Sequence, residues 1–181
     1  MIYILLADGF EEVEALAPLD IMRRCGIDVK TAGLSKTEIT GSHNITVLAD
    51  MKIEDIDMTT VEGIVLPGGL PGTTNLQKDA AVNKLIEHCD KNGLMMAAIC
   101  AAPMILGELN LLNDHDAVCF PGFEEHLKGA DIIDAFVVTS GNIITAKGAG
   151  ASLEFGEAIV DYLTKDGKGA EILQQMQYPL C

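Results

Sequence analysis

The sequence predicts an α/β protein with a doubly wound, mostly parallel sheet and helices on both faces. Short apolar runs of strand length alternate with helical patterns of about 10–15 residues, which is the order of β-α-β units. The eight repeats of a barrel are absent. Open sheets of this kind bind ligands beyond the carboxyl ends of their strands, so functional residues are expected there.

Each element is predicted from a local pattern. The apolar run at 2–7 has the length of a buried strand, and Gly26 ends the helix that follows it. A Ser-Gly-Asn turn signal at 140–142 predicts a hairpin, and 52–57 is expected to form a short helix or turn. Strands are expected at 2–7, 27–33, 63–69 and 94–99, a hairpin or two short strands at 38–50, a hairpin at 135–146, and helices at 10–25, 79–91, 101–109, 150–164 and 169–176.

Length and charge predict one domain, residues 1–181, that binds small or neutral ligands. The formal net charge is -15, from 12 basic and 27 acidic residues, which argues against a nucleic-acid backbone or an anionic membrane as partner. No run reaches the roughly 18 apolar residues that a membrane span needs.

The cysteine, histidine and glycine patterns predict neither a metal site nor a cofactor. The five cysteines are odd in number and include no C-x-x-C, and the four histidines are dispersed. This pattern is typical of free thiols in a reducing cytoplasm, the expected location. The glycine-rich segments 66–72 and 148–158 lack the surroundings of a P-loop or a dinucleotide site.

Cys100 is the first candidate for chemistry. It ends the apolar run 94–99 directly before a small-residue helix, which is the position of a nucleophile elbow. A thiol at a helix N-terminus feels the positive end of the dipole and unpaired backbone N–H groups, so we expect its pKa to fall below about 8.5. The alternative, that Cys100 is a small buried hydrophobe, stays open.

Glu14 is the second candidate because it falls on a helix face that should be buried. At about 100° per residue it shares a stripe with Phe10 and Ile21. A buried carboxyl tends to hold its proton, and near Cys100 it would act as a hydrogen-bond donor or a general acid and base. The alternatives are a side chain that reaches the helix edge or an ion pair with Arg24.

The rest of this helix carries two further expectations. Glu11 and Glu12 need no role beyond favourable charge at a helix N-terminus. The additional apolar positions, such as Leu16 and Leu19, predict a subunit contact, so helix 10–25 is expected to form a homodimer.

Backbone amides are expected to complete the site. Gly68 and Gly69 follow the middle strand and expose N–H groups, which with the amide of Ala101 would form an oxyanion hole. The alternative is an ordinary turn. No histidine adjoins the cysteine, and His115 and His126 are expected at the surface.

Five segments together resemble a known family over nearly the whole chain. The chain resembles the ThiJ/PfpI superfamily, specifically the branch of the Parkinson-disease-associated deglycase and its bacterial relatives. The resemblance implies a flavodoxin-like sandwich, akin to the class I glutamine amidotransferases, and a homodimer. The segments are "DGFEEVEALAPLDIMRRCGI", "VEGIVLPGGLPGTTNL", "AAICAAP", "CFPGFEE" and "AKGAGASLEFGEAIV".

The resemblance also implies roles for single residues. Cys100 would be the nucleophile, paired with a protonated Glu14 and readily oxidised to sulfinate. Amides matching Gly69 and Ala101 would line the oxyanion side. Ala101 stands where protease-like members carry a histidine, which argues against peptidase activity.

Pocket and activity follow from the same resemblance. Gly68 and Phe120 would line the pocket, with Phe120 where the Parkinson-associated relative carries a histidine. The implied activity is that of a cofactor-independent glyoxalase or deglycase, a lyase or hydrolase acting on α-oxoaldehydes or their glycated adducts. The alternatives are a redox-sensing or chaperone-like stress protein without turnover, or a role in thiazole biosynthesis that older family names suggest.

Overall fold

A seven-stranded sheet forms the centre of the computed structural model, which describes residues 1–179. Its strands run in the order β10-β11-β7-β6-β1-β2-β5. Every neighbouring pair is parallel except β10 and β11, which form the hairpin expected at 135–146. The strands are β1 (Ile2–Leu6), β2 (Val29–Gly33), β5 (Met51–Lys52), β6 (Gly63–Leu66), β7 (Met95–Ile99), β10 (Val137–Ser140) and β11 (Ile143–Ala146).

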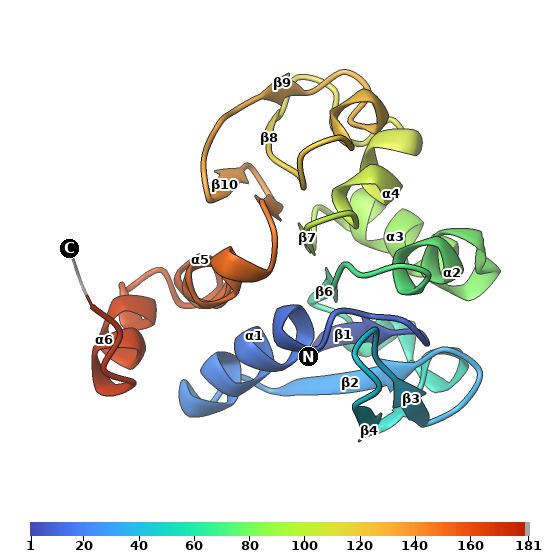
Figure 1. The fold of residues 1–181 in the computed structure, drawn as a ribbon, viewed down its shortest axis with the longest axis horizontal. Coiled ribbons are helices and arrows are strands. Elements are labelled where there is room, and N and C mark those ends of the chain that lie inside the picture. The colour runs from blue at the N-terminus through green and yellow to red at the C-terminus, as the bar shows by residue number, and fades with distance from the viewer. Residues whose placement is uncertain (180–181) are drawn as a thin grey trace.

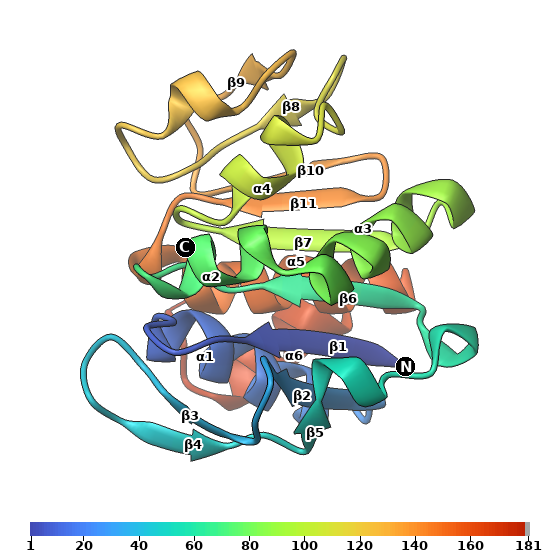
Figure 2. The same cartoon turned by 90° about the vertical axis from the view of Figure 1, so that its right-hand side faces the viewer.

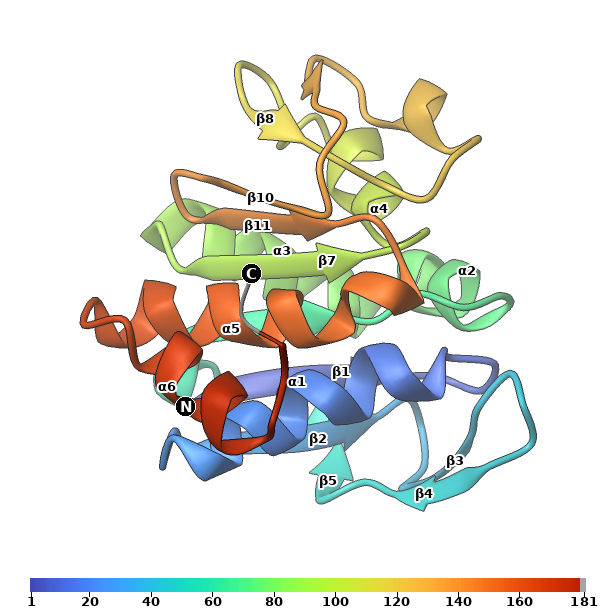
Figure 3. The same ribbon diagram turned by 60° about the vertical axis from the view of Figure 1, so that its left-hand side comes forward.

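Helices cover both faces of this sheet, as the sequence predicts. Figure 1 shows the sheet between two helical layers, Figure 2 looks onto the layer of α2 and α3, and Figure 3 looks onto the layer of α1, α5 and α6. One layer is α1 (Glu12–Arg24), α5 (Ser152–Thr164) and α6 (Lys168–Gln175); the other is α2 (Gly72–Lys78), α3 (Ala80–Asn92) and α4 (Pro103–Glu108).

The central strands are buried on both faces, so they read as continuous apolar runs rather than alternating ones. In β1, Tyr3 and Leu5 pack into the core beneath α2 and α3. Ile2, Ile4 and Leu6 pack into the core beneath α1 and α5. The sheet therefore separates two aliphatic cores. The candidate site lies beyond the carboxyl ends of the parallel strands.

Short elements are where sequence and structure differ. The segment 38–50 forms the expected hairpin, β3 (Glu38–Thr40) and β4 (Thr46–Leu48). The helix α2 and the small parallel pair β8 (Asp116–Ala117) and β9 (Asp131–Ile132) were not predicted. These elements are too short for a hydrophobic periodicity to be recognised in the sequence. In the part of the chain described, no helix combines the length and apolarity that crossing a membrane requires.

Candidate active site

Cys100 lies in a tight turn between β7 and α4. Its φ is 64°, in the left-handed region that residues other than glycine rarely adopt. Two backbone hydrogen bonds hold this conformation: the Cys100 N–H donates to the Ala146 oxygen at 2.9 Å, and the Phe120 N–H donates to the Cys100 oxygen at 2.9 Å. The end of β11 and the segment after β8 therefore fix the cysteine at the carboxyl edge of the sheet.

Glu14 reaches the same point from the first turn of α1. Its side chain is completely buried, and its Oε2 accepts the Gly68 N–H at 2.9 Å. The carboxyl group also lies beside the Cys100 thiol, and each of the two groups shifts the pKa of the other. The alternative ion pair is wrong, because Arg24 Nε donates to Asp20 at 2.7 Å.

A glycine at position 68 is what lets these segments meet. A Cβ on Gly68 would lie 2.6 Å from the Cys100 Cβ and 2.6 Å from the Glu14 Oε2. Contacts that short do not occur, so any side chain would force the cysteine and the carboxyl apart. The backbone of the loop after β6 therefore packs directly against both Cys100 and Glu14, with no side chain at position 68.

Two backbone amides face the sulfur. The backbone N–H groups of Gly69 and Ala101 act on the Cys100 thiol to lower its pKa, so both stabilise negative charge there. Gly69 and Ala101 are the two amides that the family resemblance implies for the oxyanion side. The Gly68 N–H, which the sequence pattern also suggests, donates to Glu14 instead. The loop after β6 and the turn into α4 thus supply donors to one atom from two sides.

Burial raises the pKa of Glu14 to about 7, while its hydrogen bonds with Cys100 and Gly68 act in the opposite direction. The Oε1 atom is buried and takes no hydrogen bond of normal geometry from residues 1–179. A carboxyl oxygen without a donor is well suited to carry a proton. Glu14 therefore changes its protonation close to neutral pH, where a proton-transfer group is most effective.

The expected low pKa of Cys100 is wrong. Burial, followed by the charge of the Glu14 carboxylate and its hydrogen bond, raises the pKa of Cys100 to about 12, although the Ala101 and Gly69 amides lower it. The helix dipole gives little help, because α4 is only six residues long and starts at Pro103. Formation of a reactive thiolate at this position needs an acceptor for the thiol proton. The Glu14 carboxyl lies beside the thiol and can accept it.

Phe120 is tied to the elbow by its backbone, but its ring lines a neighbouring cleft. The ring is 47% exposed and lies against Gly148. The cleft has a volume of about 340 Å³ and a mainly apolar lining, to which Phe136 and Lys147 contribute. Cys100 and Glu14 are not among the residues that line it.

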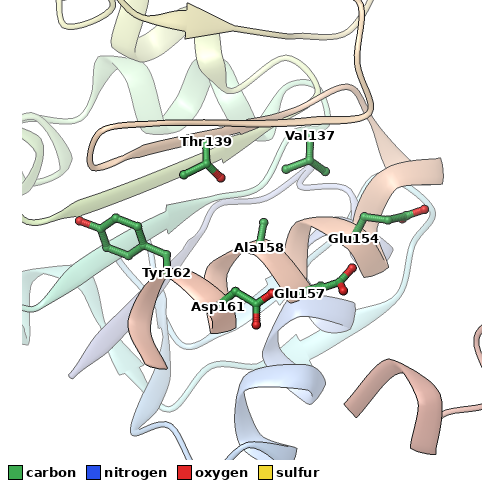
Figure 4. A pocket seen from close by; sticks show the side chains of 7 residues that line it. All are labelled: Val137, Thr139, Glu154, Glu157, Ala158, Asp161 and Tyr162. Carbon is green, nitrogen blue, oxygen red and sulfur yellow. The ribbon is translucent and has the colours of Figure 1, made fainter. Parts of the chain in front are cut away.

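A larger hollow, of about 410 Å³, lies between β10 and α5 (Figure 4). Three carboxylates of α5 line it, and burial together with Asp161 and Glu154 raises the pKa of Glu157. Its lining includes no cysteine and no basic side chain. Size alone therefore does not identify the reactive site. The lining residues are Val137, Thr139, Glu154, Glu157, Ala158, Asp161 and Tyr162.

Sequence reasoning missed one buried charge on α1. Glu12 is only 5% exposed, whereas the pattern assigned it no role beyond the helix dipole. Its carboxylate binds the turn of the β3–β4 hairpin at His43, which lies 31 residues away. No periodicity within the helix signals this contact, because it depends on where the hairpin returns to the sheet.

Fold and site define the class of protein: an α/β protein whose strained cysteine, on a strand-to-helix turn, contacts a buried carboxyl. The profile of the DJ-1/PfpI family matches residues 1–162. The chain belongs to this family, which confirms the resemblance seen in its motifs.

Known relatives agree with this assignment. The Danio rerio Parkinson disease protein 7 homolog is 34% identical, covering 98% of this chain and 94% of the relative. The Caenorhabditis elegans glutathione-independent glyoxalase DJR-1.2 is 28% identical, covering 94% and 90%. The structure of oxidized Toxoplasma gondii DJ-1 superposes with a TM-score of 0.94 at 28% identity, covering 99% and 98%. The chain spans 39% of the length of the Arabidopsis thaliana DJ-1 homolog B, to which it is 34% identical.

Proposed function

We propose that the chain is a cofactor-independent enzyme in which Cys100 and Glu14 convert α-oxoaldehydes, or their adducts, to 2-hydroxy acids. The observation that carries this proposal is the contact between the Cys100 thiol and the buried Glu14 carboxyl. The C. elegans relative named a glutathione-independent glyoxalase supports the same reaction class.

In the first step, the Cys100 sulfur adds to the aldehyde carbon. The Glu14 carboxylate takes the thiol proton as the carbon–sulfur bond forms and then gives it to the aldehyde oxygen, which leaves a hemithioacetal. A carboxyl with a pKa of about 7 is available in both protonation states near neutral pH. The amides of Gly69 and Ala101 stabilise the negative charge that develops beside the sulfur.

In the second step, Glu14 moves a proton between carbons. It removes the proton from the former aldehyde carbon and returns it to the adjacent carbon, while another proton passes between the two oxygens. The product is a 2-hydroxy thioester of Cys100. Water then cleaves the carbon–sulfur bond, releasing the 2-hydroxy acid and restoring the thiol. The net change is addition of one water molecule, and no oxidant or reductant is consumed.

The test is lactate production from methylglyoxal without glutathione. Wild type, Cys100→Ser and Glu14→Gln are compared, with Cys25→Ser as a matched control because Cys25 is also a free, partly buried cysteine. We expect lactate from wild type and Cys25→Ser only. Lactate formed equally fast by Cys100→Ser would refute the proposal.

A second candidate function is redox sensing at the same cysteine. The Gly69 and Ala101 amides that face the sulfur are placed to bind the oxygens of an oxidised cysteine. Hydrogen peroxide would transfer one oxygen atom per step, giving first sulfenate and then sulfinate and releasing one water each time. The relative from Toxoplasma gondii was solved in an oxidized form.

Peroxide titration followed by intact mass tests this second function. We expect wild type to gain the mass of two oxygen atoms at a peroxide dose that leaves Cys100→Ser unchanged. Equal oxidation of the two proteins would exclude a selective sensor at Cys100.

We further propose that the chain forms a homodimer through α1. Val13 is 44% exposed on α1, and Leu16 and Leu19 of the same helix are half-buried. Apolar side chains left partly uncovered on one helix favour self-association. Light scattering should give twice the chain mass for wild type and a smaller mass for Val13→Asp.

A cytoplasmic location is the remaining proposal. Cys25, Cys89, Cys100 and Cys119 are all free thiols, which fits a reducing compartment. Fractionation of cells that express the tagged chain tests it, and recovery outside the cytoplasm would overturn it.

A further inference from the structure

A second cluster of reactive side chains lies beside the first turn of α1. Glu11 and Glu12 at the start of this helix meet His43 in the turn of the β3–β4 hairpin, with one ligand atom from each residue within 4.8 Å of the others. Figures 2 and 3 both show the hairpin turn and the start of α1 at the same end of the molecule. The proposed catalytic pair does not use these groups.

The distances match those between ligands of one metal ion. The His43 Nδ1 lies 2.9 Å from the Glu12 Oε2 and 3.5 Å from the Glu11 Oε1. The Ser42 Oγ lies 3.1 Å from the Glu11 Oε2 and 3.1 Å from the His43 Nδ1. Ligands at about 2.0–2.2 Å from a tetrahedral zinc ion lie about 3.3–3.6 Å from one another. Small side-chain rotations are therefore enough to enclose an ion.

The Glu12 carboxylate is held in place independently of the imidazole. Its Oε1 accepts the backbone N–H groups of His43 at 2.8 Å and Ile45 at 3.4 Å, which leaves Oε2 to face the cluster. A Cβ on Gly41 would lie 2.3 Å from this carboxylate, so the glycine makes room for it. Hydrogen bonds that orient a ligating carboxylate are typical of metal sites.

The charges and the exposure of the cluster also favour a cation. Two carboxylates face one imidazole, and a single proton on its Nδ1 can be donated to only one of them at a time. The His43 side chain is 67% exposed and that of Glu12 is 7% exposed, so the cluster opens to solvent on the histidine side. An ion can thus reach a buried carboxylate directly.

We propose that Glu11, Glu12 and His43 bind one divalent transition-metal ion of the zinc class. Imidazole with carboxylates suits zinc and its neighbours, whereas calcium and magnesium prefer oxygen ligands alone. Binding through Nδ1 displaces the proton that His43 shares with Glu12 and releases it to solvent. Water or the Ser42 hydroxyl completes the coordination.

The experiment is calorimetric titration of Zn²⁺ into the full chain carrying Cys100→Ser, which removes the partly buried thiol as a competing ligand. The same background carries His43→Ala or Glu11→Gln as test variants and His88→Ala as the matched control. His88 is a half-buried histidine whose side chain, among residues 1–179, hydrogen-bonds with Asn92 alone. Circular dichroism of each metal-free variant checks that it folds, and Glu11→Gln keeps the test open should His43→Ala fail to fold.

We expect one Zn²⁺ per chain in the Cys100→Ser background and in its His88→Ala control. Binding should weaken by at least about tenfold with His43→Ala or Glu11→Gln, since removing a ligand costs no less than disturbing an outer-shell partner. The ¹⁵N resonance of the His43 Nδ1 should shift with Zn²⁺. Unchanged affinity in both test variants, or no Zn²⁺ binding to the background, would mean that the cluster is only an ion pair and would overturn the proposal.

Discussion

Two buried glutamates on α1, two residues apart, have opposite proton affinities. Glu12 is 5% exposed and Glu14 is 0% exposed. Burial raises the pKa of both. For Glu12, however, hydrogen bonds from His43 and from backbone amides outweigh burial and bring the pKa down to about 2. For Glu14, burial prevails and the pKa rises to about 7.

The comparison shows that the number of hydrogen-bond donors to each carboxyl, and not its burial, decides which of the two glutamates holds a proton. Glu12 accepts hydrogen bonds from two backbone amides and an imidazole. Glu14 accepts one backbone amide and shares a contact with a thiol. Glu12 is therefore a permanent anion that anchors a hairpin, and Glu14 is a group that gives and takes a proton beside Cys100.

The largest expected effect comes from removing the exchangeable proton of Glu14. Glu14→Gln keeps the shape of the side chain, but it can neither accept the thiol proton nor move a proton between carbons. We expect kcat for lactate formation to fall by about 10²–10⁴-fold, the usual contribution of a positioned acid–base group. Steady-state assays with methylglyoxal provide the measurement.

The matched control is Glu157→Gln, because Glu157 is another partly buried acid whose pKa is raised, on α5. It should leave kcat within about twofold of wild type, since it touches no reacting group. Equal losses in the two variants would show that the effect is one of general charge or folding, not of proton transfer.

The pH dependence of stability should separate the two acids by sign. Both carboxyls titrate near 4.5 when unfolded. Glu12 stabilises the fold above pH 4.5, and this contribution is lost as pH falls from 4.5 through 2. The contribution of Glu14 is complete below pH 4.5 and is lost as pH rises from 4.5 through 7.

Urea unfolding across this range, in buffer with a chelator, is the measurement. Relative to wild type, Glu14→Gln should gain stability between pH 4.5 and 7, by an amount that reaches about 3 kcal/mol. Glu12→Gln should lose stability relative to wild type as pH rises from 2 to 4.5. Parallel curves for the two variants would contradict the contrast.

Gly68→Ala should damage the pair without changing any charge. The new methyl group would collide with the Cys100 Cβ and the Glu14 Oε2, each 2.6 Å away. We expect a loss of about 1–3 kcal/mol in the free energy of unfolding, with reduced kcat. Wild-type stability and activity in this variant would show that the site tolerates a looser contact.

The smallest expected effect is on the reactivity of the thiol. Burial and the Glu14 carboxylate both raise the pKa of Cys100, so Glu14→Gln removes the repulsive charge and lowers that pKa. Alkylation of Cys100 by iodoacetamide above neutral pH should accelerate by about tenfold, the factor that one pKa unit gives. Peptide mapping by mass spectrometry identifies the modified cysteine. A slower reaction in Glu14→Gln would mean that removal of the thiol proton by Glu14 outweighs the repulsion by its charge, and would contradict this prediction.

Local pattern was enough to place most elements and the reactive pair. The position of Cys100 between an apolar strand and a helix predicted the elbow, and the stripe through Phe10, Glu14 and Ile21 predicted that Glu14 is buried. Both predictions depend on patterns within short stretches of the sequence. The α/β fold followed in the same way, from strand-length runs alternating with helices.

The features that were missed depend on residues far apart in sequence. The anchoring of Glu12 by His43 needs the return of the hairpin. The pKa of Cys100 depends on its burial and on the Glu14 carboxyl, which no single segment reveals. The ring of Phe120, which is expected in the pocket beside Cys100, lines a cleft with Phe136 and Lys147, and the Phe120 N–H donates to the Cys100 oxygen.

The most direct test of the central contrast is ¹³C NMR of the glutamate carboxyls across a pH titration, in metal-free buffer, with Glu14→Gln and Glu12→Gln used to assign the two signals. The Glu14 signal should titrate with a midpoint of about 7, and the Glu12 signal should remain that of a carboxylate down to about pH 2. Two signals that both titrate near 4.5, the value of an ordinary glutamate, would contradict the account.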